Sequence, residues 1–83
     1  KLMAAFADSP YALAEDWPDT LAALTELFYA FKSETRDAMA DDNLLLAMRR
    51  LFDGACGGSA EALADCRAGD LFAALSKEDA HEE

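Results

Sequence analysis

Apolar residues recur every three or four positions along most of this chain, which is the spacing that places side chains on one face of an α-helix. The clearest example begins near Pro18 and ends near Met39. Its apolar face is expected to carry Leu21, Leu24, Leu27, Phe28, Phe31 and Thr35. No segment alternates apolar and polar residues with the period of two that is typical of strands. The pattern therefore predicts an all-α fold.

The length of the chain limits this fold to one domain. Its 83 residues are close to the minimum for a hydrophobic core that has no metal or disulfide support. Apolar residues make up 53% of the sequence and charged residues 29%, a balance that is too apolar for a disordered segment. We therefore expect residues 1–83 to form one compact bundle of four to five helices.

Turn and capping residues separate the predicted helices. A helix is expected in residues 1–7, a connector or short helical turn at 11–15, and further helices at 18–39, from Asp41 or Asp42 to Phe52, at 60–65, and after Asp70 as N-cap. Gly57 and Gly58 favour a turn with positive φ. Residues 76–83 are expected to form a frayed acidic tail. The uncapped helix at Lys1 leads us to expect a fragment of a longer protein.

The predicted core follows from the phase of these helices. One apolar stripe from each helix is expected to face the others. The core residues expected on this basis are Leu21, Leu24, Phe28, Phe31, Leu45, Met48, Leu51, Phe52, Leu63, Leu71 and Leu75.

The charge of the chain excludes several kinds of partner. The net charge is −10, and the seven Lys and Arg residues are dispersed, so binding to nucleic acid is not expected. No apolar run approaches the roughly 20 residues that cross a bilayer, and no export signal is visible, so we expect a cytoplasmic protein without a membrane partner. Cys56 and Cys66 are then expected to be free thiols.

No residue pattern indicates a catalytic or cofactor-binding site, and no cofactor is expected. The single histidine, His81, lies near the end of the predicted tail, where it is poorly placed to serve as a general base. Cys56 precedes a predicted helix start, a position that can activate a thiol, but no histidine is near it in sequence. We therefore interpret Cys56 as a small buried residue in a glycine-rich turn.

Four carboxylates are the best candidates for binding a divalent cation. Glu34, Asp37, Asp41 and Asp42 lie around the junction of two predicted helices. Their spacing does not match the calcium loop of an EF-hand, and acidic residues at helix ends are ordinarily solvated surface. No metal site is therefore predicted.

Aromatic residues offer a way to bind a protein partner. Tyr11 and Trp17 lie in the predicted connector, and Tyr29 lies on the flank of the long helix. Partly exposed aromatic side chains of this kind often anchor interfaces, so these three are the candidate partner-binding residues. The alternative for Tyr11 and Trp17 is that they hold the connector against the core.

Several stretches resemble an uncharacterised family of small bacterial proteins, a domain of unknown function common in gut anaerobes. They are Phe6-Ala7-Asp8-Ser9-Pro10-Tyr11, residues 27–35, the pair Asp41-Asp42, and residues 52–59 followed by Leu63. The resemblance covers about positions 1–75. In that family, this region resembles the C-terminal half of a longer protein. The resemblance implies no activity, substrate or site.

These features favour a non-enzymatic, acidic helical module that binds protein. The expected partner is its own N-terminal half, a second copy in a homo-oligomer, or a separate subunit, and the acidic surface would favour a basic one. The alternative is an accessory part of an enzyme, in which Glu34, Asp37 or Cys56 completes an active site whose other residues lie outside this fragment. A third possibility, a mimic of nucleic acid, depends on charge alone.

Overall fold

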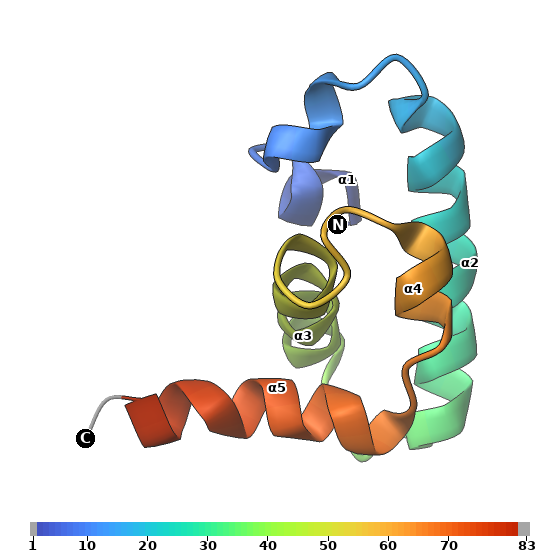
Figure 1. Cartoon of the computed structure of the whole chain (residues 1–83). Coiled ribbons are helices and arrows are strands. Elements are labelled where there is room, and N and C mark those ends of the chain that lie inside the picture. Colours follow the sequence, from blue (N-terminus) through green and yellow to red (C-terminus); the bar gives the residue numbers. More distant parts are fainter. Residues whose placement is uncertain (1, 82–83) are drawn as a thin grey trace.

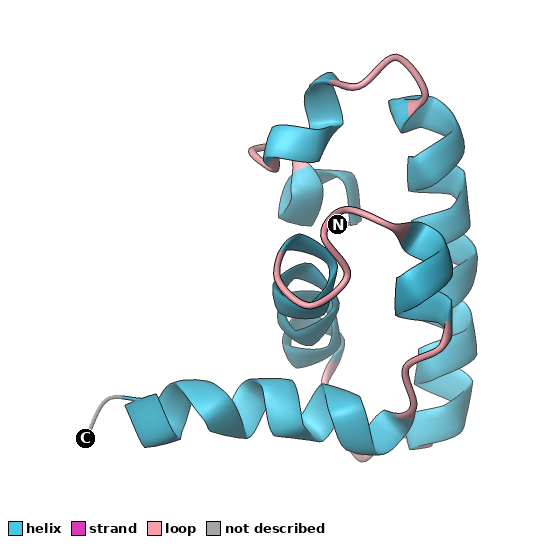
Figure 2. Cartoon of the chain, in the orientation of Figure 1, coloured by secondary structure: helices cyan, strands magenta, loops and turns pink. Residues whose placement is uncertain are grey.

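The computed structural model describes residues 2–81, which form helices joined by turns and contain no strand. The elements are α1 (Leu2–Phe6), the 3-10 helix η1 (Pro10–Leu13), α2 (Trp17–Thr35), α3 (Asp41–Asp53), α4 (Ala60–Ala64) and α5 (Ala68–His81) (Figures 1 and 2). The radius of gyration is 12.2 Å, close to the roughly 12 Å of a compact chain of this length. The prediction of a compact all-α bundle is confirmed.

Helix α3 is the central element of the bundle. It packs against α1, α2, α4 and α5, and Figure 1 shows it end-on between them. Neighbours on several sides bury more of α3 than the single stripe expected from its sequence. Its buried residues are Leu44, Leu45, Ala47, Met48 and Phe52.

Most of the predicted core is buried, and the structure adds to it. The residues predicted and found buried are Leu24, Phe31, Leu45, Met48, Phe52, Leu63 and Leu71. Those found only half-buried are Leu21, Phe28, Leu51 and Leu75. The prediction missed Phe6, Met39, Leu44, Ala47 and Ala74, which are also buried. Several of these lie beside the expected stripes, where a second neighbouring helix covers them.

Helix α2 ends at Thr35 and not near Met39. Arg36 adopts the left-handed conformation, with φ of 51°, and its N–H donates to the carbonyl of Lys32. Asp37 also has a positive φ, of 68°. Neither residue is Gly or Asn, so the sequence carried no usual signal for this C-cap. Met39 is nevertheless buried, in the turn that leads to α3.

Two predicted N-caps are wrong, the one for α3 by one or two positions and the one for α5 by three. Ala40 precedes α3, and Asp41 and Asp42 lie in its first turn, where their charges complement the helix dipole. Helix α5 begins at Ala68, and the Asp70 carboxylate accepts a hydrogen bond from the backbone N–H of Arg67 at 2.9 Å. Asp70 therefore satisfies the start of α5 from inside the helix.

The glycine turn before α4 has the predicted conformation. Gly57 and Gly58 have φ values of 58° and 83°, and the Ser59 side chain accepts from the N–H of Ala62 as N-cap of α4. Helix α5 continues to His81, and in Figure 1 it extends beyond the other helices. Fraying of residues 76–83 stays a prediction; 82 and 83 lie outside the described residues. Within the described part, no helix has the length and apolar content needed to cross a membrane.

Candidate functional site

The two blocks around Phe6 and Phe52 meet in space and form an aromatic cluster. The ring of Phe52, at the end of α3, lies 5.5 Å from Phe6 and 5.6 Å from Tyr11, both edge-to-face. Trp17 lies 6.3 Å from the Phe52 ring and 6.4 Å from the Phe6 ring. Edge-to-face aromatic pairs add about 0.5–1.5 kcal/mol beyond the burial of their area. The cluster therefore fixes α1, η1 and the start of α2 to α3.

A polar network centred on Arg49 supports the same junction. Arg49 donates to Asp53, to the carbonyl of Ala5 at 2.7 Å and to the Asp8 carboxylate at 2.8 Å. The Ser9 hydroxyl is buried and donates to Asp53 at 3.0 Å, while its oxygen also accepts from the N–H of Tyr11. Arg49 therefore connects α3 to the chain on both sides of the turn after α1. We call these four side chains, Asp8, Ser9, Arg49 and Asp53, the Arg49 network.

The charges of the Arg49 network shift the pKa values of its members in the stabilising direction. The hydrogen bond and the positive charge of Arg49 lower the pKa of the Asp8 carboxyl. The hydrogen bonds from Arg49 to Asp53 and Asp8 raise the pKa of its guanidinium. Because Asp8 is exposed to solvent, its ion pair is screened and contributes little to stability.

Gly58 allows the glycine turn to approach η1 closely. A Cβ at this position would lie 2.4 Å from the Tyr11 ring, and the φ of 83° is itself unfavourable for other residues. A Cβ at Gly57 would meet nothing within 4 Å. The close approach of backbone to ring therefore requires glycine specifically at position 58.

The three predicted partner-binding residues have different surroundings. Tyr11 and Trp17 are half-buried against the core through Phe52, and Tyr29 is 64% exposed on α2. Packing of Tyr11 and Trp17 supports their alternative interpretation as residues that hold the connector in place. Whether any of the three binds a partner stays a prediction.

A groove beside Tyr29 separates α1 from α2. We call it the α1–α2 groove; its lining includes Leu2, Met3, Phe28, Tyr29, Lys32 and Leu45, and its volume is about 430 Å³. Met3 is 70% exposed. The Tyr29 ring lies edge-to-face with Phe28, with 5.4 Å between centroids, so its orientation is set from within α2.

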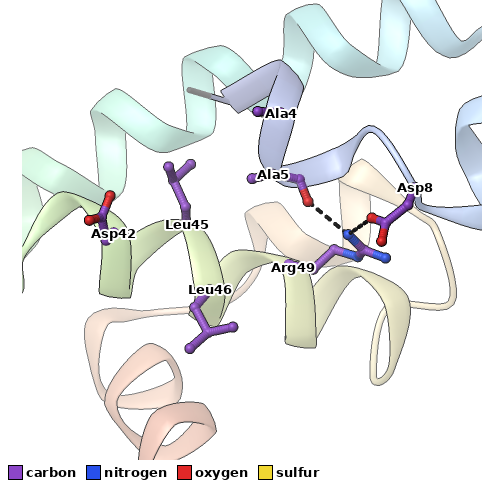
Figure 3. Close-up of a pocket in the computed structure, with 7 residues that line it drawn as sticks. All are labelled: Ala4, Ala5, Asp8, Asp42, Leu45, Leu46 and Arg49. Carbon is purple, nitrogen blue, oxygen red and sulfur yellow. Dashed lines mark hydrogen bonds and ion pairs between the residues drawn. The ribbon is translucent and has the colours of Figure 1, made fainter.

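A second groove lies on the other side of α1, against α3. This α1–α3 groove has a volume of about 590 Å³ and is lined by Ala4, Ala5, Asp8, Asp42, Leu45, Leu46 and Arg49. Figure 3 shows Asp42 at one end, Arg49 with Asp8 at the other, and the alanine and leucine side chains between them. Leu45 contributes to both grooves, so they adjoin at this side chain of α3.

The candidate cation ligands do not converge. Glu34 accepts from the backbone N–H of Ala68 at 3.2 Å, and Asp41 pairs with Lys32 at 3.3 Å. Asp37 lies in the left-handed turn after α2. Across residues whose placement the structure gives, no group of three His, Cys, Asp or Glu side chains is arranged to hold a metal ion. Glu34 instead helps to fix the start of α5 against α2.

The two cysteines are free, half-buried and close to each other. Burial, followed by the neighbouring Cys66, raises the pKa of the Cys56 thiol to about 11. Burial and the charge of Asp70 raise the pKa of Cys66. A raised pKa keeps a thiol protonated at neutral pH, where it is a weak nucleophile. The surroundings of Cys56 fit the interpretation of a buried turn residue. The side chain of His81 lies outside what the structure describes.

The sequence analysis did not identify Met3 and Leu46 as groove residues or Arg49 as the centre of a polar network. In α1, Leu2 and Phe6 are four residues apart and point to the core, which places Met3 off that face; helical phase could have shown this. Helical phase likewise places Leu46 off the face of α3 that buries Leu45 and Met48. Arg49 had no such signal, since its partners Ala5 and Asp8 are 44 and 41 positions away.

Comparison with known proteins identifies a family. The model of a family of unknown function (DUF6323) matches residues 1–81. No curated protein and no solved structure matches the chain.

Proposed function

We propose for this protein, which belongs to the DUF6323 family of unknown function, a role as a non-enzymatic helical module that binds another protein. The observation that carries this proposal is the location of its exposed apolar side chains. Among the described residues, five large apolar side chains are exposed, and three of them, Met3, Tyr29 and Leu46, line the two grooves beside α1.

Exposed apolar side chains that lie close together indicate a different role from scattered ones. Scattered apolar side chains are normal on a soluble protein, whereas contiguous ones are typical of a binding surface. Covering apolar surface stabilises a complex by about 25 cal/mol per Å² before the costs of association. Tyr29 and Met3 contribute little to the fold, because most of their surface is in solvent. Their apolar area is therefore available to a partner.

The charge of the chain favours a separate, basic partner over a second copy. At a net charge of −10, two copies repel each other, while a basic protein is attracted and guided to the surface. This attraction affects the rate of association more than the final affinity. The apolar grooves would then supply most of the binding free energy.

Photo-crosslinking in cells of the native host tests the proposal. Benzoylphenylalanine at position 29 retains an aromatic ring and reacts with C–H bonds of any neighbouring protein. We expect a discrete covalent adduct on a denaturing gel after irradiation, because Tyr29 lies at the proposed interface. Light scattering of the purified protein distinguishes a second copy from a different partner.

Leu13 provides a matched control. It is 91% exposed and apolar, but it lies on η1 and lines neither groove. Benzoylphenylalanine at position 13 is expected to give no discrete adduct. An adduct from position 13 alone would place the partner on the connector with Tyr11 and Trp17. Absence of an adduct from either position would contradict the proposal.

A further inference from the structure

We propose that Cys56 and Cys66 are a reversible oxidation site, at which a low-molecular-weight disulfide converts the two thiols into an intramolecular disulfide that bridges the ends of α4. This site is separate from the proposed binding surface, because neither cysteine lines the grooves beside α1. It is supported by three observations: the position of the cysteines at the ends of α4, the contact between their side chains, and their partial exposure to solvent.

The two cysteines lie in the segments that flank a very short helix. Cys56 precedes α4 in the glycine turn, and Cys66 follows α4 in the linker to α5. Figure 1 shows these two segments at the two ends of α4. Helix α4 has five residues, about 7.5 Å at 1.5 Å per residue, so the segments at its ends can approach each other. Neither cysteine belongs to a helix, so both can adjust their positions without distortion of a helix.

The two thiols also interact with each other in the reduced protein. Each side chain lies within hydrogen-bonding reach of the other, and both pack against the same hydrophobic core. A disulfide requires the two sulfur atoms to move from this contact to a separation of about 2.05 Å. Folding has therefore already brought the thiols together, and most of the entropy cost of closing the loop between them has been overcome before oxidation.

The oxidation proceeds by two thiol–disulfide exchanges. The thiolate of one cysteine attacks a sulfur of the disulfide RSSR, an S–S bond of mixed type forms, and RS⁻ leaves. The second cysteine then attacks the cysteine sulfur of this mixed disulfide, forms the internal S–S bond and releases the second RS⁻. The two protons of the cysteine thiols end on two molecules of RSH. The cysteines lose two electrons and RSSR gains them, so a thiol in excess reverses the reaction.

The surroundings of the thiols determine which oxidant is suitable. Burial raises the pKa of the Cys56 thiol to about 11, so the first exchange is slow at neutral pH. Both cysteines are only half-buried, so a small reagent can reach them. The negative charges of Asp65 and Asp70 act on the thiols and would repel an anionic disulfide. The expected oxidant is therefore a neutral or cationic disulfide.

Equilibration of the reduced 83-residue protein with hydroxyethyl disulfide and mercaptoethanol tests the proposal. Mass spectrometry of the intact protein distinguishes the internal disulfide, which lacks two hydrogen atoms, from a mixed disulfide, and peptide mapping without reductant identifies the bridge. We expect a monomer that contains the Cys56–Cys66 bridge. Its melting temperature should exceed that of the reduced protein by at least about 5 °C, because the bridge restricts the unfolded chain. Dithiothreitol should restore the original mass and melting temperature.

The same equilibration in urea measures the contribution of the fold. The ratio of bridged to reduced protein gives the effective concentration of one thiol at the other, and we expect it to be at least about tenfold higher in the folded protein than in urea. Cys66→Ser is the matched control, since it retains a small polar side chain and cannot form the bridge. The oxidant should give this variant a mixed disulfide at Cys56 and no rise in melting temperature.

Four results would overturn the proposal. They are an effective concentration in the folded protein no higher than in urea, mixed disulfides in place of the bridge, bridges between two molecules, or a bridged protein that melts no higher than the reduced one. The first and the last would show that the fold does not hold the thiols in a position to form the bridge. All four are measured on the protein with both cysteines, so the test does not depend on the folding of the control variant.

Discussion

The two ends of helix α1 differ in how the rest of the protein covers them. At the C-terminal end, Phe6 is completely buried among aromatic rings, and the Arg49 network fixes the turn that follows. At the N-terminal end, Met3 is 70% exposed and lines the α1–α2 groove. We call these the closed end and the open end. One short helix thus serves stability at one end and leaves apolar surface uncovered at the other.

This difference shows how so small a domain can fold and still leave apolar surface uncovered. A helix of five residues has no stability of its own and depends on tertiary contacts. Contacts concentrated at the closed end hold α1 in place, so the open end need not be buried. Substitutions at the two ends should therefore have opposite effects on stability and on binding.

The largest effect is expected from Phe52→Ala, which removes the centre of the closed end. Phe52 is completely buried and contacts the rings of Phe6, Tyr11 and Trp17. Its truncation should cost about 3–5 kcal/mol, most of the stability of a small domain. Urea unfolding followed by circular dichroism measures the loss. A cost below about 1 kcal/mol would show that the cluster does not hold the junction.

The glycine turn provides the next comparison. Gly58→Ala places a Cβ against the Tyr11 ring and also forces a positive φ on alanine, so we expect a cost of about 2–4 kcal/mol. Gly57→Ala also forces a positive φ on alanine, but its Cβ contacts nothing, so it should cost only about 1 kcal/mol. Thermal melts of the two variants measure the difference. Equal melting temperatures would contradict the close approach of Gly58 to Tyr11.

Ser9→Ala tests the polar part of the closed end. The variant loses the hydrogen bond to Asp53 and the cap on Tyr11, so a cost of about 1–3 kcal/mol is expected. Ser33→Ala is a suitable control, because Ser33 is exposed near the C-terminal end of α2. Chemical denaturation of both variants provides the measurement. A neutral Ser9→Ala would mean that the Arg49 network does not stabilise α1.

Substitution at the open end should barely change stability. Met3→Ser is expected to alter the free energy of unfolding by no more than about 0.5 kcal/mol, because its side chain is mostly in solvent. Tyr29→Ser also loses the edge-to-face contact with Phe28, so a cost of up to about 1 kcal/mol is expected. For a domain of this size, these changes shift the melting temperature by about 2–8 °C. A drop above 10 °C in either melt would show that the open end belongs to the core.

Alkylation of Cys56 tests the burial of the glycine turn after α3 without changing the sequence. With a thiol pKa of about 11, the reactive thiolate is scarce at neutral pH, and its fraction rises about tenfold per pH unit. The rate of modification by iodoacetamide should therefore still rise steeply between pH 9 and pH 10, whereas in urea, where the thiol has its ordinary pKa, it should approach a plateau by about pH 10. Fragmentation mass spectrometry separates Cys56 from Cys66. The same pH profile in the folded protein as in urea would contradict the burial of Cys56.

Helical periodicity predicted what depends on local sequence. It placed Leu24, Met48 and Phe52 in the core and Ser59 at the start of α4, because helix phase and side-chain capping act within a few residues. It placed the end of α2 too late, because Arg36 adopts a left-handed conformation that only the connection to α3 requires.

The candidate site depends on contacts that periodicity does not contain. The sequence offered Tyr11, Trp17 and Tyr29 alike as partly exposed aromatics, with an alternative role in holding the connector for the first two. They differ because Phe52, more than 20 positions away, packs against the first two and not against the third. The grooves also depend on tertiary contacts, since each is formed where α1 lies beside another helix.

The most direct test of the account compares Met3→Ser with Ser9→Ala in one assay. Both variants carry benzoylphenylalanine at position 29, and the yield of adduct and the melting temperature are measured for each. The account predicts that Met3→Ser loses the adduct and keeps the parental melting temperature, while Ser9→Ala melts lower and, below its melt, keeps the adduct. If both variants lose adduct only in proportion to their loss of stability, the two ends of α1 do not have separate roles.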